Sequence, residues 1–247
     1  MNEKPKVTIV MPAYNAARTL SMTYEAIPHG IADEILLVDD ASRDATVETA
    51  KALGIPIIRH PHNVGYGGNQ KTCYMEALRN GADIVVMLHP DGQYDPTILP
   101  HMIDPIIRGE ADLVLGSRFA TRGGALAGGM PFYKYLSNRF LTTVENLVLG
   151  TKLTEMHTGY RAYSRRFLET VPFLRNSVDF SFDTEILFQA VRFGFRIAEV
   201  PVTTKYFPEA SSASLGQSTV YGLKTLSIAF RYFLYRTGVL KPAIFRG

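Results

Sequence analysis

The segment 89–96, HPDGQYDP, combines residue types and a spacing that suit a divalent cation. His89, Asp91 and Gln93 alternate along the backbone just after an apolar run, so all three side chains could face one ion. Carboxylate and amide oxygens are ligands of hard cations such as Mg²⁺, which in turn bridge substrate phosphates. An imidazole suits Mn²⁺ better than Mg²⁺, so His89 is predicted either as a ligand or as a structural neighbour of the ion.

Two adjacent acids, Asp39 and Asp40, close another apolar run. A carboxylate at the tip of a strand can accept a hydrogen bond from a nucleobase imide or a ribose hydroxyl. The same residue types also cap helices, and the segment 42–44 that follows has the composition of a cap. We therefore predict Asp39 as a ligand contact, and Asp40 or the segment 42–44 as the cap.

Four basic residues could hold phosphate oxygens, although a lone cation is more often a solvated surface residue. Arg118 is the strongest candidate, because the preceding Gly-Ser lets the backbone approach a ligand and a guanidinium can grip phosphate through two nitrogens. The other three candidates are Lys134, Arg161 and Lys205.

Two further acids, Asp183 and Glu185, lie at the start of a predicted helix. Carboxylates in a first turn stabilise the positive end of the helix dipole. Either acid could instead be a general base that takes the proton of an acceptor hydroxyl. The residues alone leave both roles open.

Short apolar runs that alternate with helical stretches predict an α/β fold for the first half of the chain. The runs are continuous rather than alternating, which is typical of parallel strands buried on both faces. Ligands bind at the carboxyl ends of such strands, so the polar segments that follow the runs should meet at one edge of the sheet. The predicted strands are 6–11, 34–38, 56–59, 83–88 and 112–116, and the predicted helices are 16–27, 44–53, 68–80 and 96–108.

The second half begins with a glycine-rich segment, 121–130, which is predicted to be a lid or linker over the site. It lacks both the G-x-G-x-x-G pattern of a dinucleotide-binding fold and the lysine of a P-loop, so both nucleotide-binding classes are disfavoured. The remaining predicted elements are helices at 131–149 and 182–194, strands at 160–164 and 196–202, and a last helix after the polar loop 209–218.

The composition is that of a globular protein in a reducing compartment. With 247 residues and 46% apolar side chains, the chain can bury a sizeable core. Its one cysteine, Cys73, excludes an intramolecular disulfide and a Cys-based zinc site, and is predicted to pack in a helix. The net charge of only +3 argues against a nucleic-acid partner bound by bulk charge.

The positive charge is concentrated near the C-terminus, where residues 205–247 carry six basic residues and one acid. Within this segment, 221–240 mixes aromatic and aliphatic residues with three basic ones. Such a pattern is typical either of a packed C-terminal helix or of an interfacial helix on an anionic membrane. The sequence shows no signal-peptide core and no membrane-spanning window, so we predict a cytoplasmic protein, free or peripheral on the membrane.

Six motifs follow one another between about residues 6 and 205: VTIVMPAYNAARTL, EILLVDDASRDAT, HNVGYGGN, VVMLHPDGQYDP, DLVLGSRF and HTGYRAYSRR. In order and spacing they resemble family-two glycosyltransferases of the GT-A fold, in particular the dolichyl-phosphate mannose synthase-like or polyprenyl-phosphate branch. The resemblance implies a nucleotide-diphospho-sugar transferase fold with a mostly parallel central sheet flanked by helices. It also implies transfer of a sugar from a nucleotide diphosphate with inversion, assisted by Mg²⁺ or Mn²⁺.

By position, the resemblance implies that Asp91 matches the last Asp of the family's Asp-x-Asp metal motif and Gln93 the ligand that follows it. Arg118 matches the arginine of Gly-Ser-Arg, and Lys134 matches the basic position that binds acceptor phosphate. The candidate catalytic residues are then Asp91, Arg118 and Asp183. The implied nucleotide contacts are Pro12, Ala13, Tyr14, Asp39, Asn63 and Gly65.

This sequence departs from the family pattern in three ways. His89 stands where the first Asp of Asp-x-Asp is expected. Ala16 replaces the Glu that is usual in mannose synthases, so a UDP-sugar donor is favoured over GDP-mannose. The transmembrane helices that many polyprenyl enzymes append are missing, so a membrane acceptor requires peripheral docking.

We therefore predict an inverting glycosyltransferase that acts on a polyprenyl phosphate, which is anionic and needs no general base. The alternative acceptor is a sugar hydroxyl, for which Asp183 or Glu185 would be the base. A nucleotidyltransferase is disfavoured, because the first loop has no glycine-rich triphosphate-binding segment with a lysine. A non-catalytic nucleotide-binding module is the other alternative, suggested by His89.

The predicted domain organisation is a single catalytic domain over 1–217. Its nucleotide-binding half spans about 1–118 and its acceptor half about 119–217. A basic amphipathic helix and tail follow at 218–247, and the sequence leaves the oligomeric state open.

Overall fold

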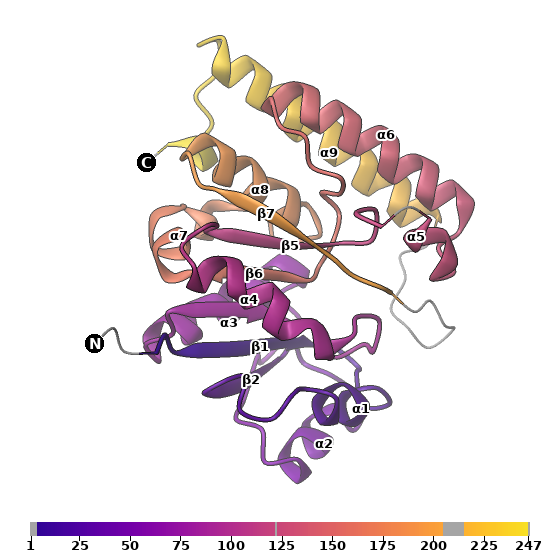
Figure 1. Ribbon diagram of the computed structural model, residues 1–247, viewed down its shortest axis with the longest axis vertical. Helices are drawn as coiled ribbons and strands as arrows, with labels where there is room; N and C mark the ends of the chain where they lie inside the picture. Colours follow the sequence, from indigo (N-terminus) through magenta and orange to yellow (C-terminus); the bar gives the residue numbers. More distant parts are fainter. Residues whose placement is uncertain (1–3, 122, 205–214, 247) are drawn as a thin grey trace.

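The computed structural model describes residues 4–121, 123–204 and 215–246, and these contain a seven-stranded sheet with the order β3-β2-β1-β4-β6-β5-β7 (Figure 1). Six strands run parallel to one another, and β6 alone runs antiparallel, between β4 and β5. The strands are β1 (Val7–Ala13), β2 (Glu34–Asp39), β3 (Ile57–Arg59), β4 (Ile84–Met87), β5 (Leu113–Ser117), β6 (Arg161–Ser164) and β7 (Ile197–Pro201).

Helices cover both faces of the sheet, and successive side chains of the central strands point to opposite faces. On one face, Val10 of β1 packs in a core with side chains of α3, α8 and α9. On the other, Ile9 and Met11 pack with α1 and α4. The described helices are α1 (Leu20–Glu25), α2 (Thr46–Ala52), α3 (Tyr66–Arg79), α4 (Leu99–Ile107), α5 (Gly124–Ala127), α6 (Phe132–Leu149), α7 (Arg165–Thr170), α8 (Ser181–Arg192) and α9 (Leu215–Arg236), with short 3₁₀ turns at Pro96–Ile98, Phe173–Arg175 and Ala243–Phe245.

The predicted mostly parallel α/β sheet is confirmed, and each predicted strand is present within two residues of its expected ends. Because β6 runs against its neighbours, it is the start of β6, not its end, that lies with the carboxyl ends of β1, β4 and β5. The segment just before β6 therefore enters the edge of the sheet where a ligand is expected. Cys73 is fully buried in α3, which confirms its predicted packing role.

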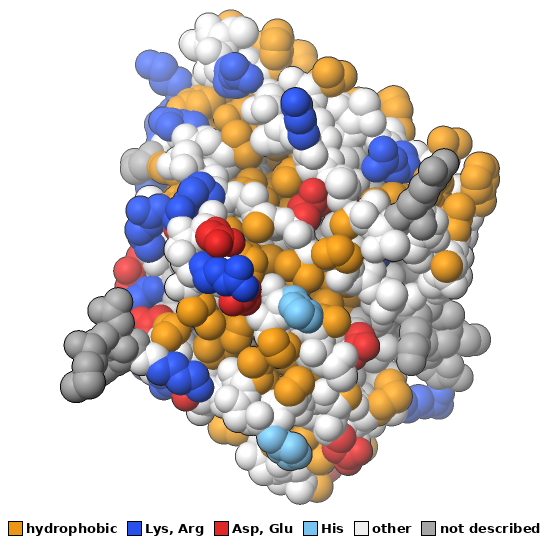
Figure 2. All heavy atoms as spheres, in the orientation of Figure 1, with side chains coloured by type: hydrophobic (Ala, Val, Ile, Leu, Met, Phe, Trp, Pro, Cys, Tyr) orange, Lys and Arg blue, Asp and Glu red, His pale blue; other side chains and the backbone are white. Residues whose placement is uncertain are grey.

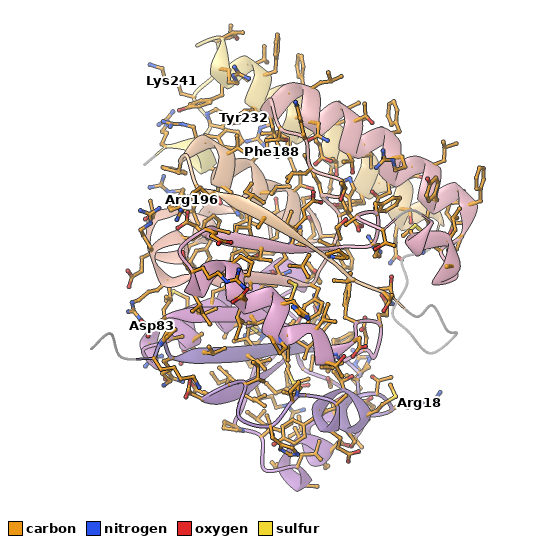
Figure 3. The ribbon with its side chains drawn as sticks, viewed as in Figure 1. Arg18, Asp83, Phe188, Arg196, Tyr232 and Lys241 are labelled. Carbon is orange, nitrogen blue, oxygen red and sulfur yellow. The ribbon has the colours of Figure 1, made fainter. Side chains whose placement is uncertain are left out.

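The last helix, α9, lies alongside α6 and packs on α8 (Figure 1). Figure 3 shows Phe188 of α8 and Tyr232 of α9 meeting in the core, with ring centroids 5.2 Å apart. Ile228 and Ala229 of α9 are buried in the same core. Among the described helices, none is both long and apolar enough to cross a bilayer.

The described part of the glycine-rich segment is folded rather than open. It contains the short helix α5, and Ala125 and Met130 are buried. A Cβ on Gly128 would come within 2.3 Å of the Thr204 carbonyl oxygen, so only glycine allows this segment to approach the end of the sheet so closely. Whether the segment moves as a lid stays a prediction.

Candidate active site

A cleft of about 660 Å³ opens at the carboxyl ends of the strands. It is built from the loops after β1, β2, β3, β4 and β5, together with the start of α6 and the segments before β6 and α8. The structure thus brings together most of the residues that the sequence singled out. Those that line the cleft are Pro12, Ala13, Tyr14, Asn63, Gly65, His89, Asp91, Gln93, Arg118 and Lys134.

The loop after β1 is fixed by side chains from the loop after β2. The backbone NH of Asn15 donates to Ser42 Oγ at 2.9 Å, and that of Ala16 donates to Thr46 Oγ1 at 2.8 Å. Asp44 accepts from the backbone NH of Thr46 at the start of α2. The N-cap of α2 is Ala45, which makes no side-chain cap hydrogen bond, so the segment 42–44 is not the cap that the sequence predicted. It instead contacts the start of α2 through Asp44 and holds the nucleotide-side loop in place through Ser42.

Asp40 does not cap a helix either. Its Oδ1 accepts from the backbone NH of Val64 at 2.8 Å and lies 2.9 Å from His60 Nδ1, and its Oδ2 accepts from Gly65 NH at 3.1 Å. Asp40 therefore shapes the loop that carries Asn63 and Gly65 into the cleft. It also lines the cleft itself.

Asp39, the predicted nucleobase contact, lies behind Asp40 and is fully buried. One oxygen, Oδ2, accepts from Ser42 NH at 3.1 Å and lies 3.5 Å from Arg59 Nε. The other, Oδ1, has no hydrogen-bond partner within the described part of the chain. Asp39 is not part of the cleft lining, so its role as a base contact stays a prediction.

His89 is half-buried in the cleft lining and stacks on Tyr66, with ring centroids 5.5 Å apart. Burial lowers the pKa of His89 although Asp91 and Asp183 oppose this, so the imidazole is neutral at physiological pH. Its Nε2 is 3.2 Å from Tyr66 Oη. A Cβ on Gly159 would lie 2.9 Å from the same Nε2, so the approach of the segment before β6 to His89 requires glycine there.

Asp91 lies on the cleft with its Oδ1 accepting from Gln93 NH at 3.0 Å. Burial raises the pKa of Asp91, while His89 and the Gln93 hydrogen bond oppose the rise. Over the residues the structure describes, no group of three or more His, Cys, Asp or Glu side chains is placed to hold a metal ion. Mg²⁺ often takes only one or two carboxylates and completes its shell with water and substrate phosphates, and the pair Asp91 and Gln93 fits that arrangement.

Arg118 is anchored by an acid that the sequence did not reveal. Its Nε donates to Glu155 Oε1 at 2.8 Å and its backbone NH donates to Glu155 Oε2 at 2.7 Å. Glu155 is fully buried and also accepts from Asn138 of α6 at 3.1 Å. A third contact joins Arg118 Nη2 to the carbonyl oxygen of His157 at 3.0 Å. The guanidinium is therefore held rigidly at the cleft wall.

Lys134 differs from Arg118, because it has no counterion. No hydrogen bond or ion pair joins its ammonium group to another residue in 4–121, 123–204 or 215–246. Burial and the neighbouring Arg118 cation lower the pKa of Lys134. Two like charges side by side, one of them uncompensated, form a site suited to an anion.

A second cavity of about 250 Å³ adjoins the cleft between α6 and α9. Its lining is mostly apolar and aromatic, with Met130, Tyr133, Leu141 and Phe180 among its residues. The two cavities share a wall, formed by Tyr66, Arg118, Lys134, His157, Gly159 and Phe180.

Arg161 does not lie where its predicted role as a phosphate-binding residue requires. Its side chain is fully buried and lines neither cavity. It donates to the carbonyl oxygens of Thr158 at 2.8 Å, Asp183 at 2.8 Å and Met156 at 3.1 Å. Arg161 therefore holds the segment before β6 to α8, because those backbone oxygens would otherwise be buried unpaired. Lys205, the other distal cation, lies outside the described residues.

Asp183 lines the second cavity, but its oxygens are already engaged. Oδ2 accepts from Tyr66 Oη at 2.7 Å, and Oδ1 accepts from Gln70 Nε2 at 3.2 Å and lies 3.8 Å from Arg161. Glu185 lines neither cavity and instead accepts from the backbone NH of Ser177 at 2.5 Å. Glu185 therefore does not face a ligand in either cavity, whereas the predicted catalytic role of Asp183 stays a prediction.

Comparison with known families gives one model match, to the family described as glycosyl transferase family 2, over residues 8–171. A protein of Methanococcus voltae named UDP-N-acetylglucosamine--dolichyl-phosphate N-acetylglucosaminyltransferase is 27% identical, and the alignment covers 94% of this chain and 96% of that protein. The undecaprenyl-phosphate mannosyltransferase of Micrococcus luteus is 30% identical, with 80% of this chain and 83% of that protein covered.

Among solved structures, glucosyl-3-phosphoglycerate synthase of Mycobacterium tuberculosis matches with a TM-score of 0.72 and 21% identity. The match covers 96% of this chain and 80% of that one. That enzyme was crystallised with Mn²⁺, UDP and phosphoglyceric acid. At this identity the likeness concerns the fold, which agrees with the predicted GT-A architecture.

Proposed function

Because this chain belongs to glycosyl transferase family 2, and is therefore a glycosyltransferase, we propose that it transfers a sugar from a UDP-sugar to a polyprenyl phosphate. The observation that carries the proposal is the pair of adjoining cavities with Lys134 and Arg118 in their common wall. One cavity is polar-edged and lies at the strand ends, where nucleotides bind in α/β sheets. The other is lined in part by Met130, Tyr133, Leu141 and Phe180, which suit the first units of a lipid chain.

The donor side of the proposal rests on the β1 and β2 loops. Tyr14 lines the cleft with half of its surface exposed, so its ring is available to a nucleobase. The unpaired Oδ1 of Asp39 supports a contact to a base NH reached by a small local shift. Ala16 lines the cleft where mannose synthases usually carry Glu, so this position offers no carboxylate to a guanine base, which supports UDP over GDP-mannose. The name of the Methanococcus voltae relative also gives UDP-N-acetylglucosamine as its donor.

Charge neutralisation of the leaving diphosphate is the chemistry that a bound Mg²⁺ or Mn²⁺ would supply, held by Asp91 and Gln93. His89, neutral and stacked on Tyr66, lines the same cleft and adds no positive charge to it. Arg118 faces the same region from a fixed position, because Glu155 holds it on two sides. These residues orient the diphosphate without having to reorganise during the reaction.

The acceptor side of the proposal rests on Lys134 and on Asp183. A phosphate monoester is anionic near neutral pH, so it can attack without a general base, and Lys134 would hold it against the shared wall. The hydrogen bonds of Asp183 to Tyr66 and Gln70 argue against the sugar-hydroxyl alternative, which needs a base. Both transferase relatives named above act on polyprenyl-type phosphates according to their names.

The proposed reaction is a single displacement with inversion. An oxygen of the acceptor phosphate forms a bond to the anomeric carbon while the bond from that carbon to the diphosphate oxygen breaks. The nucleoside diphosphate leaves with the electron pair, and the products are a polyprenyl-phosphate sugar and the nucleotide.

A lipid acceptor implies contact with a membrane surface, and two helices carry features that support it. On α6, Phe132 is 69% and Phe140 58% exposed, and on α9 Phe230 is 61% exposed. Figure 2 shows hydrophobic side chains in orange along the upper right margin, over α6. We therefore include peripheral attachment through α6 and α9 in the proposal.

The test is a donor screen. Purified protein is incubated with UDP-N-acetylglucosamine, UDP-glucose or GDP-mannose, with and without Mn²⁺, and with and without a short polyprenyl phosphate. We expect UDP release that needs both the cation and the lipid phosphate, and a polyprenyl-phosphate sugar detected by mass spectrometry.

Two variants sharpen the screen. Asp91→Asn should abolish transfer, whereas Lys152→Ala, which removes an exposed cation away from both cavities, should leave it unchanged. Nucleotide release that depends on a soluble sugar and ignores the polyprenyl phosphate would overturn the proposed acceptor.

A further inference from the structure

Three residues from three elements meet beside the second cavity, and none of them was among the site residues that the sequence analysis proposed. They are Glu145 of α6, His157 in the segment before β6, and Tyr221 of α9. His157 Nε2 lies 3.0 Å from Glu145 Oε2, and His157 Nδ1 lies 2.8 Å from Tyr221 Oη. His157 and Tyr221 line the cavity, and Glu145 is fully buried behind them.

The pair of Glu145 and His157 behaves as a buried ion pair. A fully buried carboxylate requires a cation close by, and His157 is the partner that lies within 4 Å. The contact is close but bent away from a linear hydrogen bond, so its strength is mainly electrostatic. Burial opposes the charged imidazole, but Tyr221 and Glu145 outweigh it and raise the pKa of His157 to about 10.

The charge of His157 fixes the direction of the next hydrogen bond. In an imidazolium both nitrogens carry hydrogen, so Nδ1 donates to Tyr221 Oη. The hydroxyl hydrogen of Tyr221 must then point to another acceptor. Thr184 Oγ1, at 3.3 Å, is a long contact, and the remaining direction is the cavity that Tyr221 lines. If the imidazole were neutral, Nδ1 could instead accept the hydrogen bond, and the hydroxyl hydrogen of Tyr221 would then point to Nδ1 rather than into the cavity.

We propose that Tyr221 is an acceptor-binding residue, whose hydroxyl donates to an anionic oxygen of the acceptor because the Glu145–His157 pair holds it in the donating orientation. This rests on the proposed function, in which the second cavity takes a phosphate-bearing lipid. His157 is a positioning residue in this scheme, because both of its nitrogens are occupied within the protein.

The charged groups around the cavity agree with this assignment. Arg118 donates to the carbonyl oxygen of His157, and Lys134 lies in the wall that the two cavities share. With Tyr221 as a third donor, the cavity presents hydrogen-bond donors to a group that offers several acceptors and no hydrogens. A phosphate monoester dianion has that character, and a sugar hydroxyl does not.

The first test is Tyr221→Phe, which removes only the hydroxyl. We expect the KM for a short polyprenyl phosphate to rise roughly tenfold, as for loss of one hydrogen bond to a charged group, while the KM for the UDP-sugar stays unchanged. The matched control is Tyr235→Phe on the same helix, whose hydroxyl accepts from Arg192 and which lines neither cavity. An acceptor KM within twofold of wild type in Tyr221→Phe would overturn the inference.

The second test reads His157 without any substrate. ¹⁵N NMR of histidine-labelled protein at pH 7.5 should show both nitrogens of His157 protonated, and Glu145→Gln should move the ring to its neutral form. In activity, Glu145→Gln should raise the acceptor KM as Tyr221→Phe does, and the double variant should add nothing further. A neutral His157 in the wild-type protein would contradict the scheme.

The outcomes separate the two proposals. If wild-type protein transfers no sugar to polyprenyl phosphate, the proposed function fails, whatever the NMR result. If wild-type protein transfers the sugar but Tyr221→Phe leaves the acceptor KM unchanged, only the role of Tyr221 fails.

Discussion

Lys134 is the residue on which the proposed binding of an anion depends most directly, because it lies between both cavities and has no counterion among residues 4–121, 123–204 and 215–246. Arg118, its neighbour, has its charge compensated by the buried Glu155. An incoming phosphate would relieve the repulsion between the two cations. The proposed function therefore makes Lys134 a determinant of acceptor affinity.

We predict that Lys134→Ala raises the acceptor KM by roughly tenfold to a hundredfold, the range expected for a lost charge-assisted hydrogen bond. Burial and Arg118 lower the pKa of Lys134, so its ammonium group loses its proton below the ordinary pKa of lysine. The value of kcat/KM for the acceptor should therefore begin to fall at a pH below that ordinary pKa. Lys134→Arg should keep activity and shift this alkaline fall to higher pH. A pH profile identical in wild type and Lys134→Arg would contradict the assignment.

A second prediction concerns Asp183, whose replacement should lower the stability of the protein but leave kcat nearly unchanged. Asp183→Asn leaves the buried Arg161 without its carboxylate, so the free energy of unfolding should fall by about 3 kcal/mol, measured by urea titration. Because no general base is needed in the proposed reaction, kcat of the folded variant at low temperature should stay within a few-fold of wild type. Glu185→Gln is the companion control, and a kcat loss of a thousandfold in either variant would restore the hydroxyl-acceptor alternative.

The sequence placed the cleft residues correctly where position after a strand was enough to place them, as for Asp91 and Arg118. It was wrong for Arg161, because a guanidinium that satisfies backbone carbonyls looks the same in sequence as one that binds phosphate. Glu155 was missed because its partner, Arg118, is 37 positions away and no local pattern links them. The available signal was the position of Glu155, an acid two positions before the motif HTGYRAYSRR.

At the scale of elements, the direction of the short strand β6 determines which residues reach the cleft. The segment 160–164, YRAYS, predicts a strand but carries no information on its direction. Because β6 runs antiparallel, the segment 155–159 before it reaches the cleft. Glu155, His157 and Gly159 are thereby placed against Arg118, Tyr221 and His89, and these contacts join α6 and α9 to the sheet.

The ion pair of His157 and Glu145 predicts that the stability of the protein depends on pH. The pKa of His157 is about 10 in the folded protein and near 6.5 in an unfolded chain, so folding favours the charged form. The stabilisation by the ion pair is complete below about pH 6.5 and is lost as the pH rises through 10. Wild type should exceed His157→Gln in free energy of unfolding by on the order of 3 kcal/mol at pH 6.5, and the difference should shrink by pH 10.

Urea titrations of wild type and His157→Gln at both pH values measure this difference in free energy of unfolding. Groups that titrate equally in both proteins cancel when one free energy is subtracted from the other. Thr143→Ala on α6 serves as the control, because it removes an exposed neutral side chain that does not contact His157, so its difference from wild type should not depend on pH. A wild-type advantage that is constant from pH 6.5 to 10 would mean that His157 is neutral in the folded protein.

At the scale of the whole molecule, α9 of the basic C-terminal segment packs beside α6, a contact that the sequence did not predict. The described part of the segment begins with α9, which packs beside α6, and both helices expose aromatic and aliphatic side chains (Figure 1). The second cavity opens between them. The exposed apolar surface, the basic residues and the proposed acceptor site thus occur on the same side of the sheet.

We therefore predict that wild-type protein co-sediments with vesicles containing phosphatidylglycerol at low salt and is released as salt rises, because screening weakens the attraction of its basic residues. Replacing Phe140 of α6 and Phe230 of α9 by glutamate should weaken binding at least tenfold, since burial of each aromatic ring contributes about 1.5 to 3 kcal/mol. Ile107→Glu, an equally exposed apolar site on α4 at the opposite face of the sheet, is the matched control and should bind as wild type does. Activity on a micellar acceptor should survive the double glutamate variant, because neither ring lines a cavity. Wild-type protein that stays in the supernatant with anionic vesicles at low salt would show that the apolar surface of α6 and α9 does not meet a membrane.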